Sequence, residues 1–193
     1  MKTPEMIRTG APIEEIEARL DLLQPDERIT EVRTWSAKDL RVLYELTADR
    51  PAPKAHFVPP SVPDGVPVRH FGINSLPLFR EFEKRFLRDE ETGDLHGYNH
   101  QKMSPFTGPG YFVLEEPGAG ERATIDYNRI PLVLPHESWP KLAPNTRLPQ
   151  LLVYGHMRDV MQLVSRHVSI GRAEKKGKPA PAWFALVRQD PLP

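Results

Sequence analysis

The chain has 193 residues, 39% of them hydrophobic, so it is long enough to bury a core within one domain. It contains no cysteine, which excludes disulfides, thiolate metal sites, iron–sulfur clusters and cysteine nucleophiles. Lysine plus arginine and aspartate plus glutamate both number 26, so no overall charge attracts nucleic acid or an anionic membrane.

Proline divides the chain. Of its 22 prolines, one group lies in residues 51–67 and another in residues 131–149. Each proline fixes φ and removes a backbone donor, so both stretches are expected to be extended connectors without regular pairing. We therefore expect an N-terminal helical segment over residues 1–50, a proline-rich connector over 51–67, and a main body over 68–193. The helical segment is expected to dock on the body, which gives one domain overall.

Two helices are indicated before the connector. Ile13, Ile16 and Leu20 follow one another at spacings of three and four, which places them on one face of a helix. Ser36 and Asp39 have the arrangement of a capping box, in which each side chain bonds the backbone of the other, and predict the start of a second helix.

After the connector the pattern predicts an α+β fold, with a mainly antiparallel sheet of about five or six strands packed with helices. One helix is expected from Ser75, with an aromatic stripe of Phe79, Phe82 and Phe86, and another over residues 153–164. The last two strands are expected to form a hairpin around Lys176–Lys178. The expected strands cover residues 66–71, 95–101, 111–116, 123–129, 168–173 and 183–188.

Motifs for metal and phosphate binding are missing from the sequence. No HExxH, His-x-His or EF-hand pattern occurs, so no metal site is expected. The paired glycines in residues 107–110 and 117–120 precede strands, whereas a dinucleotide loop requires a helix at that point. We interpret these glycines as turn residues and expect no metal or redox cofactor.

The strand expected at residues 95–101 carries polar groups on both faces. Period-two alternation places His96, Tyr98 and His100 on one face and Asn99 on the other. We expect the imidazoles and the phenol to face a hollow and the amides to face away. A second polar strand would contribute further groups, and Phe79 or Phe82 an apolar wall. The candidate catalytic residues are His96, His100 and Asp126, and the candidate ligand-binding residues are Tyr98, Asn99, Tyr127, Asn128, Phe79 and Phe82.

Three functions remain open from the sequence. The leading hypothesis is a small-molecule-binding domain without metal or redox cofactor, whose ligand the sequence does not identify. The second is a metal-free acid–base or hydrolytic enzyme in which His96 or His100 acts with Asp126 or Tyr127. The third is a protein-interaction module, which includes self-association as a homodimer. Nucleic acid is not expected as a partner. Nor is a membrane, since no window has the apolar length of a membrane helix or signal peptide, and we expect a cytoplasmic location.

Overall fold

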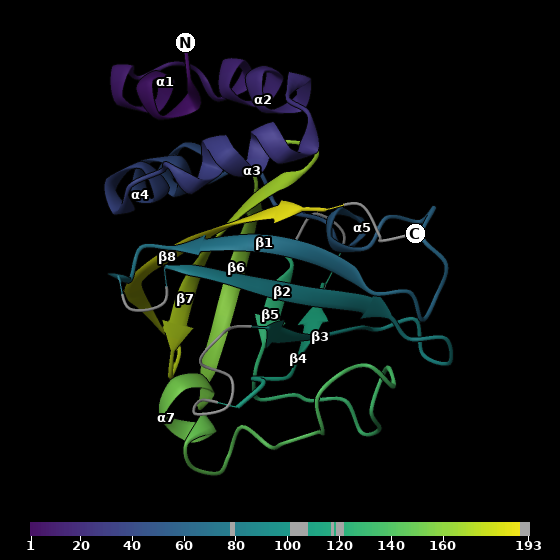
Figure 1. Cartoon of the computed structure of the whole chain (residues 1–193). Coiled ribbons are helices and arrows are strands. Elements are labelled where there is room, and N and C mark those ends of the chain that lie inside the picture. Colours follow the sequence, from purple (N-terminus) through teal and green to yellow (C-terminus); the bar gives the residue numbers. More distant parts are fainter. Residues whose placement is uncertain (78–79, 101–107, 117, 119–121, 190–193) are drawn as a thin grey trace.

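The computed structural model describes residues 1–77, 80–100, 108–116, 118 and 122–189. Within them, a layer of helices lies over one side of a strongly curved sheet (Figure 1). The helices of this layer come first in the chain and all the strands follow. This order places the two layers in separate parts of the sequence.

Eight strands form the sheet, and each pairs antiparallel with the next strand along the chain. They are β1 (Val68–Asn74), β2 (Glu81–Arg88), β3 (Leu95–His100), β4 (Phe112–Glu115), β5 (Thr124–Asp126), β6 (Met157–Leu163), β7 (Val168–Lys175) and β8 (Lys178–Arg188). Strand β1 also pairs with β8, so the sheet closes into a barrel. Closure removes the free edges that an open sheet would expose.

The α+β prediction, with five or six strands, is therefore wrong, because the sheet has eight strands and is closed. The prediction of a helix from Ser75 is wrong over the residues that form β2. Most of the helix predicted over residues 153–164 is instead strand β6, which is preceded by the short helix α7 (Gln150–Tyr154). Phe82 and Phe86 suggested a helix because they are four residues apart. Four is also an even spacing, so the same pair lies on one face of a strand.

Alternate residues of each strand point into the barrel, and apolar side chains fill much of its interior. Buried members of the interior core include Val68, Phe86, Phe112, Leu114, Ile125 and Leu186.

The β7–β8 hairpin turns at Lys176 and Gly177, which have φ of 53° and 71°, and the hairpin expected there is confirmed. Positive φ at both central residues is the geometry of a tight hairpin turn.

Residues 1–50 form four helices where the sequence predicted a pair. They are α1 (Thr3–Thr9), α2 (Ile13–Leu22), α3 (Pro25–Arg33) and α4 (Ala37–Leu46). The helices expected at Ile13 and after Ser36 are confirmed as α2 and α4. The capping box is also present, since Ser36 Oγ accepts from the Asp39 backbone nitrogen at 3.2 Å and the Asp39 carboxylate accepts from that of Ser36 at 2.8 Å.

A second core joins these helices to the outer face of the barrel. Strands β1, β7 and β8 supply its barrel side, and Trp35 is fully buried at its centre. The Trp35 indole donates to Thr3 Oγ1 at 2.8 Å, which ties α1 to the end of α3. The helical layer thus covers one side of the barrel (Figure 1). The domain boundaries at residues 50 and 67 stay a prediction.

The proline-rich connector closes one end of the barrel. It contains the short helix α5 (Lys54–Phe57), whose Phe57 is fully buried and stacks on His70 of β1, with ring centroids 5.9 Å apart. His70 Nε2 lies 2.9 Å from the Phe57 carbonyl oxygen. Ala52, Val58 and Val62 are buried beside it. The connector therefore packs as an apolar plug.

Gly97 of β3 is required by a close approach inside the barrel. A Cβ atom there would overlap the ring of Phe112 and lie 2.5 Å from the Arg85 carbonyl oxygen. We expect Gly97→Ala to lower the free energy of unfolding by about 1–3 kcal/mol, the usual cost of overpacking a core. Urea denaturation measures this change. The double variant Gly97→Ala/Phe112→Leu should recover part of the loss, and an unchanged urea midpoint in the single variant would contradict the packing described.

Candidate functional site

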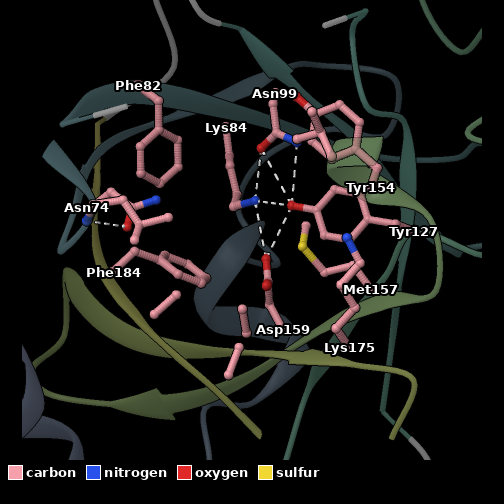
Figure 2. A pocket seen from close by; sticks show the side chains of 15 residues that line it. Asn74, Phe82, Lys84, Asn99, Tyr127, Tyr154, Met157, Asp159, Lys175 and Phe184 are labelled. Carbon is pink, nitrogen blue, oxygen red and sulfur yellow. Dashed lines mark hydrogen bonds and ion pairs between the residues drawn. The ribbon is translucent and has the colours of Figure 1, made fainter. Parts of the chain in front are cut away.

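The barrel contains a cavity of about 230 Å³ at the end opposite the connector plug. Helix α7 lies beside it and contributes Val153 and Tyr154. Its walls are mostly apolar or aromatic, and Phe82 and Phe184 lie on one side in edge-to-face contact (Figure 2). Small side chains of β7 and β8, Ala173, Ala180 and Ala182, leave space near the end of the hairpin.

Four polar side chains converge inside this cavity: Lys84, Asn99, Tyr127 and Asp159 (Figure 2). Lys84 Nζ donates to Asn99 Oδ1 at 2.8 Å, to the Tyr127 hydroxyl, and to Asp159 Oδ2 at 3.4 Å. Tyr127 in turn donates to Asp159 Oδ2 at 3.1 Å. Asn99 Nδ2 donates to the Gly110 carbonyl oxygen at 3.3 Å, which fixes the amide. The four groups form one connected network, hereafter the polar cluster.

The polar cluster lies at the meeting point of four strands. Lys84 is on β2, Asn99 on β3 and Asp159 on β6, while Tyr127 directly follows β5. In the barrel register, Lys84 lies opposite both His70 of β1 and Asn99. Because closure brings inward residues of distant strands together, side chains separated by 75 positions can form one ion pair.

One acceptor of the polar cluster is unused. Lys84 has three protons and three acceptors, so its hydrogen bonds are complete. Asp159 accepts both of its bonds on Oδ2, and among the described residues nothing donates to its Oδ1. A cavity-bound molecule with a hydroxyl or N–H group can therefore be recognised there.

Burial sets the electrostatics of the polar cluster. The side chains of Lys84 and Asp159 are each only 3% exposed. Desolvation penalises both charges, so it lowers the pKa of the Lys84 ammonium and raises the pKa of the Asp159 carboxyl, and the two groups stabilise each other's charge. Desolvation also raises the pKa of Tyr127 well above its ordinary value, which keeps the phenol a hydrogen-bond donor.

Aromatic rings surround the Lys84 ammonium. Its Nζ lies 5.0–5.6 Å from the ring centroids of Phe82, Phe112, Tyr127 and Phe184. A cation within about 6 Å of a ring face is attracted by the ring quadrupole. The rings therefore compensate part of the lost hydration while keeping the surroundings apolar.

Comparisons with known protein families, with curated proteins and with solved structures found no match for this chain. Function is therefore inferred from the cavity itself. In the part of the chain that the structure describes, no helix has the length and apolar character needed to cross a membrane. Within the same residues, no three His, Cys, Asp or Glu side chains are grouped as a metal site would require.

Three of the residues expected to bind a ligand line this cavity: Phe82, Asn99 and Tyr127. Tyr98 does not, since it faces outward and packs against Trp139 with ring centroids 4.9 Å apart. Asn128 also lies outside, where it bonds the Asp126 carboxylate at 2.7 Å. These outward positions separate them from the polar cluster. Phe79 is not among the described residues.

The alternation expected around residue 98 is present, but the hollow lies on the opposite face from the one expected. The inward residue is the amide Asn99, whereas His96 is half-buried on the outside and His100 is exposed. Gly97 explains the reversal, because a residue without a side chain leaves room for the inward ring of Phe112. The face of β3 that carries Asn99, which was expected to point away from the hollow, is thus the one that lines the cavity.

The acid–base pairs proposed from the sequence are not brought together among the described residues. Asp126 binds Arg158 through Nη2 at 2.7 Å and Nε at 3.0 Å. His96 and Asp126 share the outer face, but Val113 lies between them in the register, so their backbones are roughly 10 Å apart. The carboxylate beside His96 is Asp89, with His96 Nδ1 to Asp89 Oδ2 at 3.8 Å.

Sequence reasoning missed Lys84 and Asp159, which form the ion pair of the polar cluster. Both lay in segments interpreted as helices, where charges between apolar residues are normally exposed. A period-two interpretation gives the inward rows Phe82, Lys84, Phe86 and Met157, Asp159, Met161. In each row one charged residue stands between two apolar ones. That pattern is the signal that could have located the site.

Proposed function

We propose that the protein binds a small, largely apolar molecule carrying one polar group, inside the barrel cavity. The observation that carries this proposal is the polar cluster enclosed in an apolar barrel and bordering an open volume of about 230 Å³. Binding sites for small molecules commonly combine apolar walls with a few convergent polar groups. The closed barrel supports the same conclusion, since its interior offers a preformed space.

The size of the cavity limits the ligand. It is smaller than the roughly 300–1,000 Å³ of sites for drug-sized molecules. An apolar cavity of about 150 Å³ in another protein accommodates one benzene molecule. A ligand of about one ring therefore suits this cavity, with its polar group directed at Asp159 Oδ1.

The matched pair p-cresol and toluene tests the polar end of the proposal. Both have one methylated ring, but only p-cresol can donate a hydrogen bond to Asp159 Oδ1. We expect p-cresol to bind at least tenfold more tightly, because a hydrogen bond to a charged group contributes about 1.5–3 kcal/mol. Titration calorimetry measures the two affinities. Equal affinity of the two compounds would show that the polar cluster does not contribute to binding. If neither compound binds, the proposal is refuted.

A cavity-filling variant tests the location. Ala182→Trp places a large ring among the small residues at the cavity wall, so we expect p-cresol binding to be lost. Lys178→Trp is the matched control, because Lys178 is exposed at the start of the same strand. Circular dichroism checks that both variants are folded. Binding that persists in a folded Ala182→Trp protein would place the ligand elsewhere.

A further inference from the structure

Lys84 is a primary amine inside a cavity, a placement that structural stability does not require. Among the described lysines it alone is buried, at 2% exposure, whereas Lys175 at the cavity rim is exposed. Burying an ion pair in a core offers little or no stability over apolar residues of similar volume. A buried lysine facing a ligand space is instead a recurring arrangement for amine chemistry.

We propose that Lys84 forms a Schiff base with an apolar aldehyde or ketone bound in the barrel cavity. The inference rests on the proposed function, because it uses the same cavity and names the reactive group of its ligand. Lys84 lines the open volume, and the longest polar contact of its Nζ, 3.4 Å to Asp159 Oδ2, is the one that a ligand oxygen can most readily replace.

The chemistry is condensation. The Lys84 ammonium first passes a proton to Asp159, and the free nitrogen lone pair attacks the carbonyl carbon. The carbonyl π electrons move to oxygen, and one proton passes from the attacking nitrogen to this oxygen, which gives a neutral carbinolamine. Asp159 then returns its proton to the hydroxyl group, and the nitrogen lone pair expels it as water, which leaves an iminium and the Asp159 carboxylate. The overall change, one ammonium plus one carbonyl giving one iminium plus one water, conserves charge and needs no oxidant or reductant.

The surroundings of Lys84 suit each stage of this reaction. Asp159 is close enough to accept the first proton and to return it to the departing oxygen, and as a carboxylate it then balances the iminium charge. Desolvation lowers the pKa of Lys84, which increases the fraction of free amine. The ring faces around Nζ attract an iminium as they attract the ammonium.

The test is reductive trapping of the full chain with p-tolualdehyde and sodium cyanoborohydride. The hydride converts an iminium into a stable secondary amine, and peptide mapping locates it. At about pH 7 an exposed lysine, with a pKa of about 10.4, is almost fully protonated and reacts slowly. We expect one lysine adduct per chain, at Lys84, formed at least tenfold faster than at Lys175, suppressed by excess p-cresol and absent from Ala182→Trp.

The controls separate the failure of this inference from that of the proposed function. Lys84→Arg keeps a cation in the polar cluster but has no primary amine, so a folded variant should lose the adduct. If p-cresol binds and trapping gives adducts only at exposed lysines, or none, the Schiff base is refuted and the binding function stands. If neither p-cresol nor the aldehyde enters the cavity, both are refuted.

Discussion

Lys84→Met is expected to lower the free energy of unfolding by about 3–5 kcal/mol. The change removes the ammonium but leaves Asp159 fully enclosed, with its carboxylate deprived of its cation. It also removes the donor that holds Asn99 Oδ1 and the Tyr127 hydroxyl. Methionine fills a similar volume, so the cost measures the electrostatic disruption and not a void. Urea denaturation at neutral pH measures the change.

Two further variants show whether the ion pair is the cause. In Lys84→Met/Asp159→Asn the orphaned charge is gone and Tyr127 keeps an acceptor, so most of the loss should be recovered. Lys175→Met is the control at the cavity rim, where the exposed amine donates to the Leu152 carbonyl oxygen at 3.0 Å, and it should change stability by less than about 0.5 kcal/mol. If Lys84→Met is as stable as the double variant, the ion pair is not what the substitution disrupts.

Acid is expected to destabilise the fold through two buried histidines at the plugged end of the barrel. His56 and His70 are buried with ring centroids 6.4 Å apart, and His56 Nε2 and His70 Nδ1 each lack a hydrogen-bond partner among the described residues. Desolvation lowers the pKa of His70 to about 3 and that of His56 well below its ordinary value. The positive charge of Arg188 acts in the same direction on both.

The direction of this pH effect follows from the number of protons that the histidines bind in the folded and the unfolded chain. Since both histidines are neutral in the folded chain, their stabilising effect is fully present above the unfolded pKa of about 6.5 and is lost as the pH falls toward the folded pKa. Between about pH 7.5 and pH 5.5 each histidine should reduce the free energy of unfolding by about 1.4 kcal/mol.

Urea denaturation at these two pH values measures the effect. His70→Gln, which can still donate to the Phe57 carbonyl oxygen, should show about 1.4 kcal/mol less pH dependence than the unaltered chain. His156→Asn, a change at an exposed histidine with φ of 57°, serves as the control and should leave the dependence unchanged. Equal pH dependence in His70→Gln and the unaltered chain would show that His70 contributes nothing to it.

The local elements could be predicted where one signal dominated. Ser36 and Asp39 located the start of α4, and the sequence Lys176–Gly177 located the last turn. Closure of the sheet could not be predicted in this way. It depends on pairing between β1 and β8, which no local pattern reveals. Even spacings such as that between Phe82 and Phe86 also fit helix and strand equally.

The candidate site was predictable in part for the same reason. Tyr127 and Asn99 were predicted to bind a ligand because they are polar residues of expected strands, and both belong to the polar cluster. Their inward direction is decided by what surrounds the strand, above all the ring of Phe112 beside Gly97. Lys84 and Asp159 are brought together only by the closed sheet, so the ion pair follows from the fold and not from spacing.

The seam between β1 and β8 has a consequence for synthesis on the ribosome. His70 pairs with Arg188, so the barrel cannot close until residue 188 has emerged. Contacts this distant in sequence are slow to form. Helices α1 to α4 leave the exit tunnel before the barrel strands, yet part of their docking surface belongs to β8, the last strand of the barrel. The indole of Trp35 should therefore reach its buried environment only in the final folding phase, which makes its fluorescence a reporter of barrel closure.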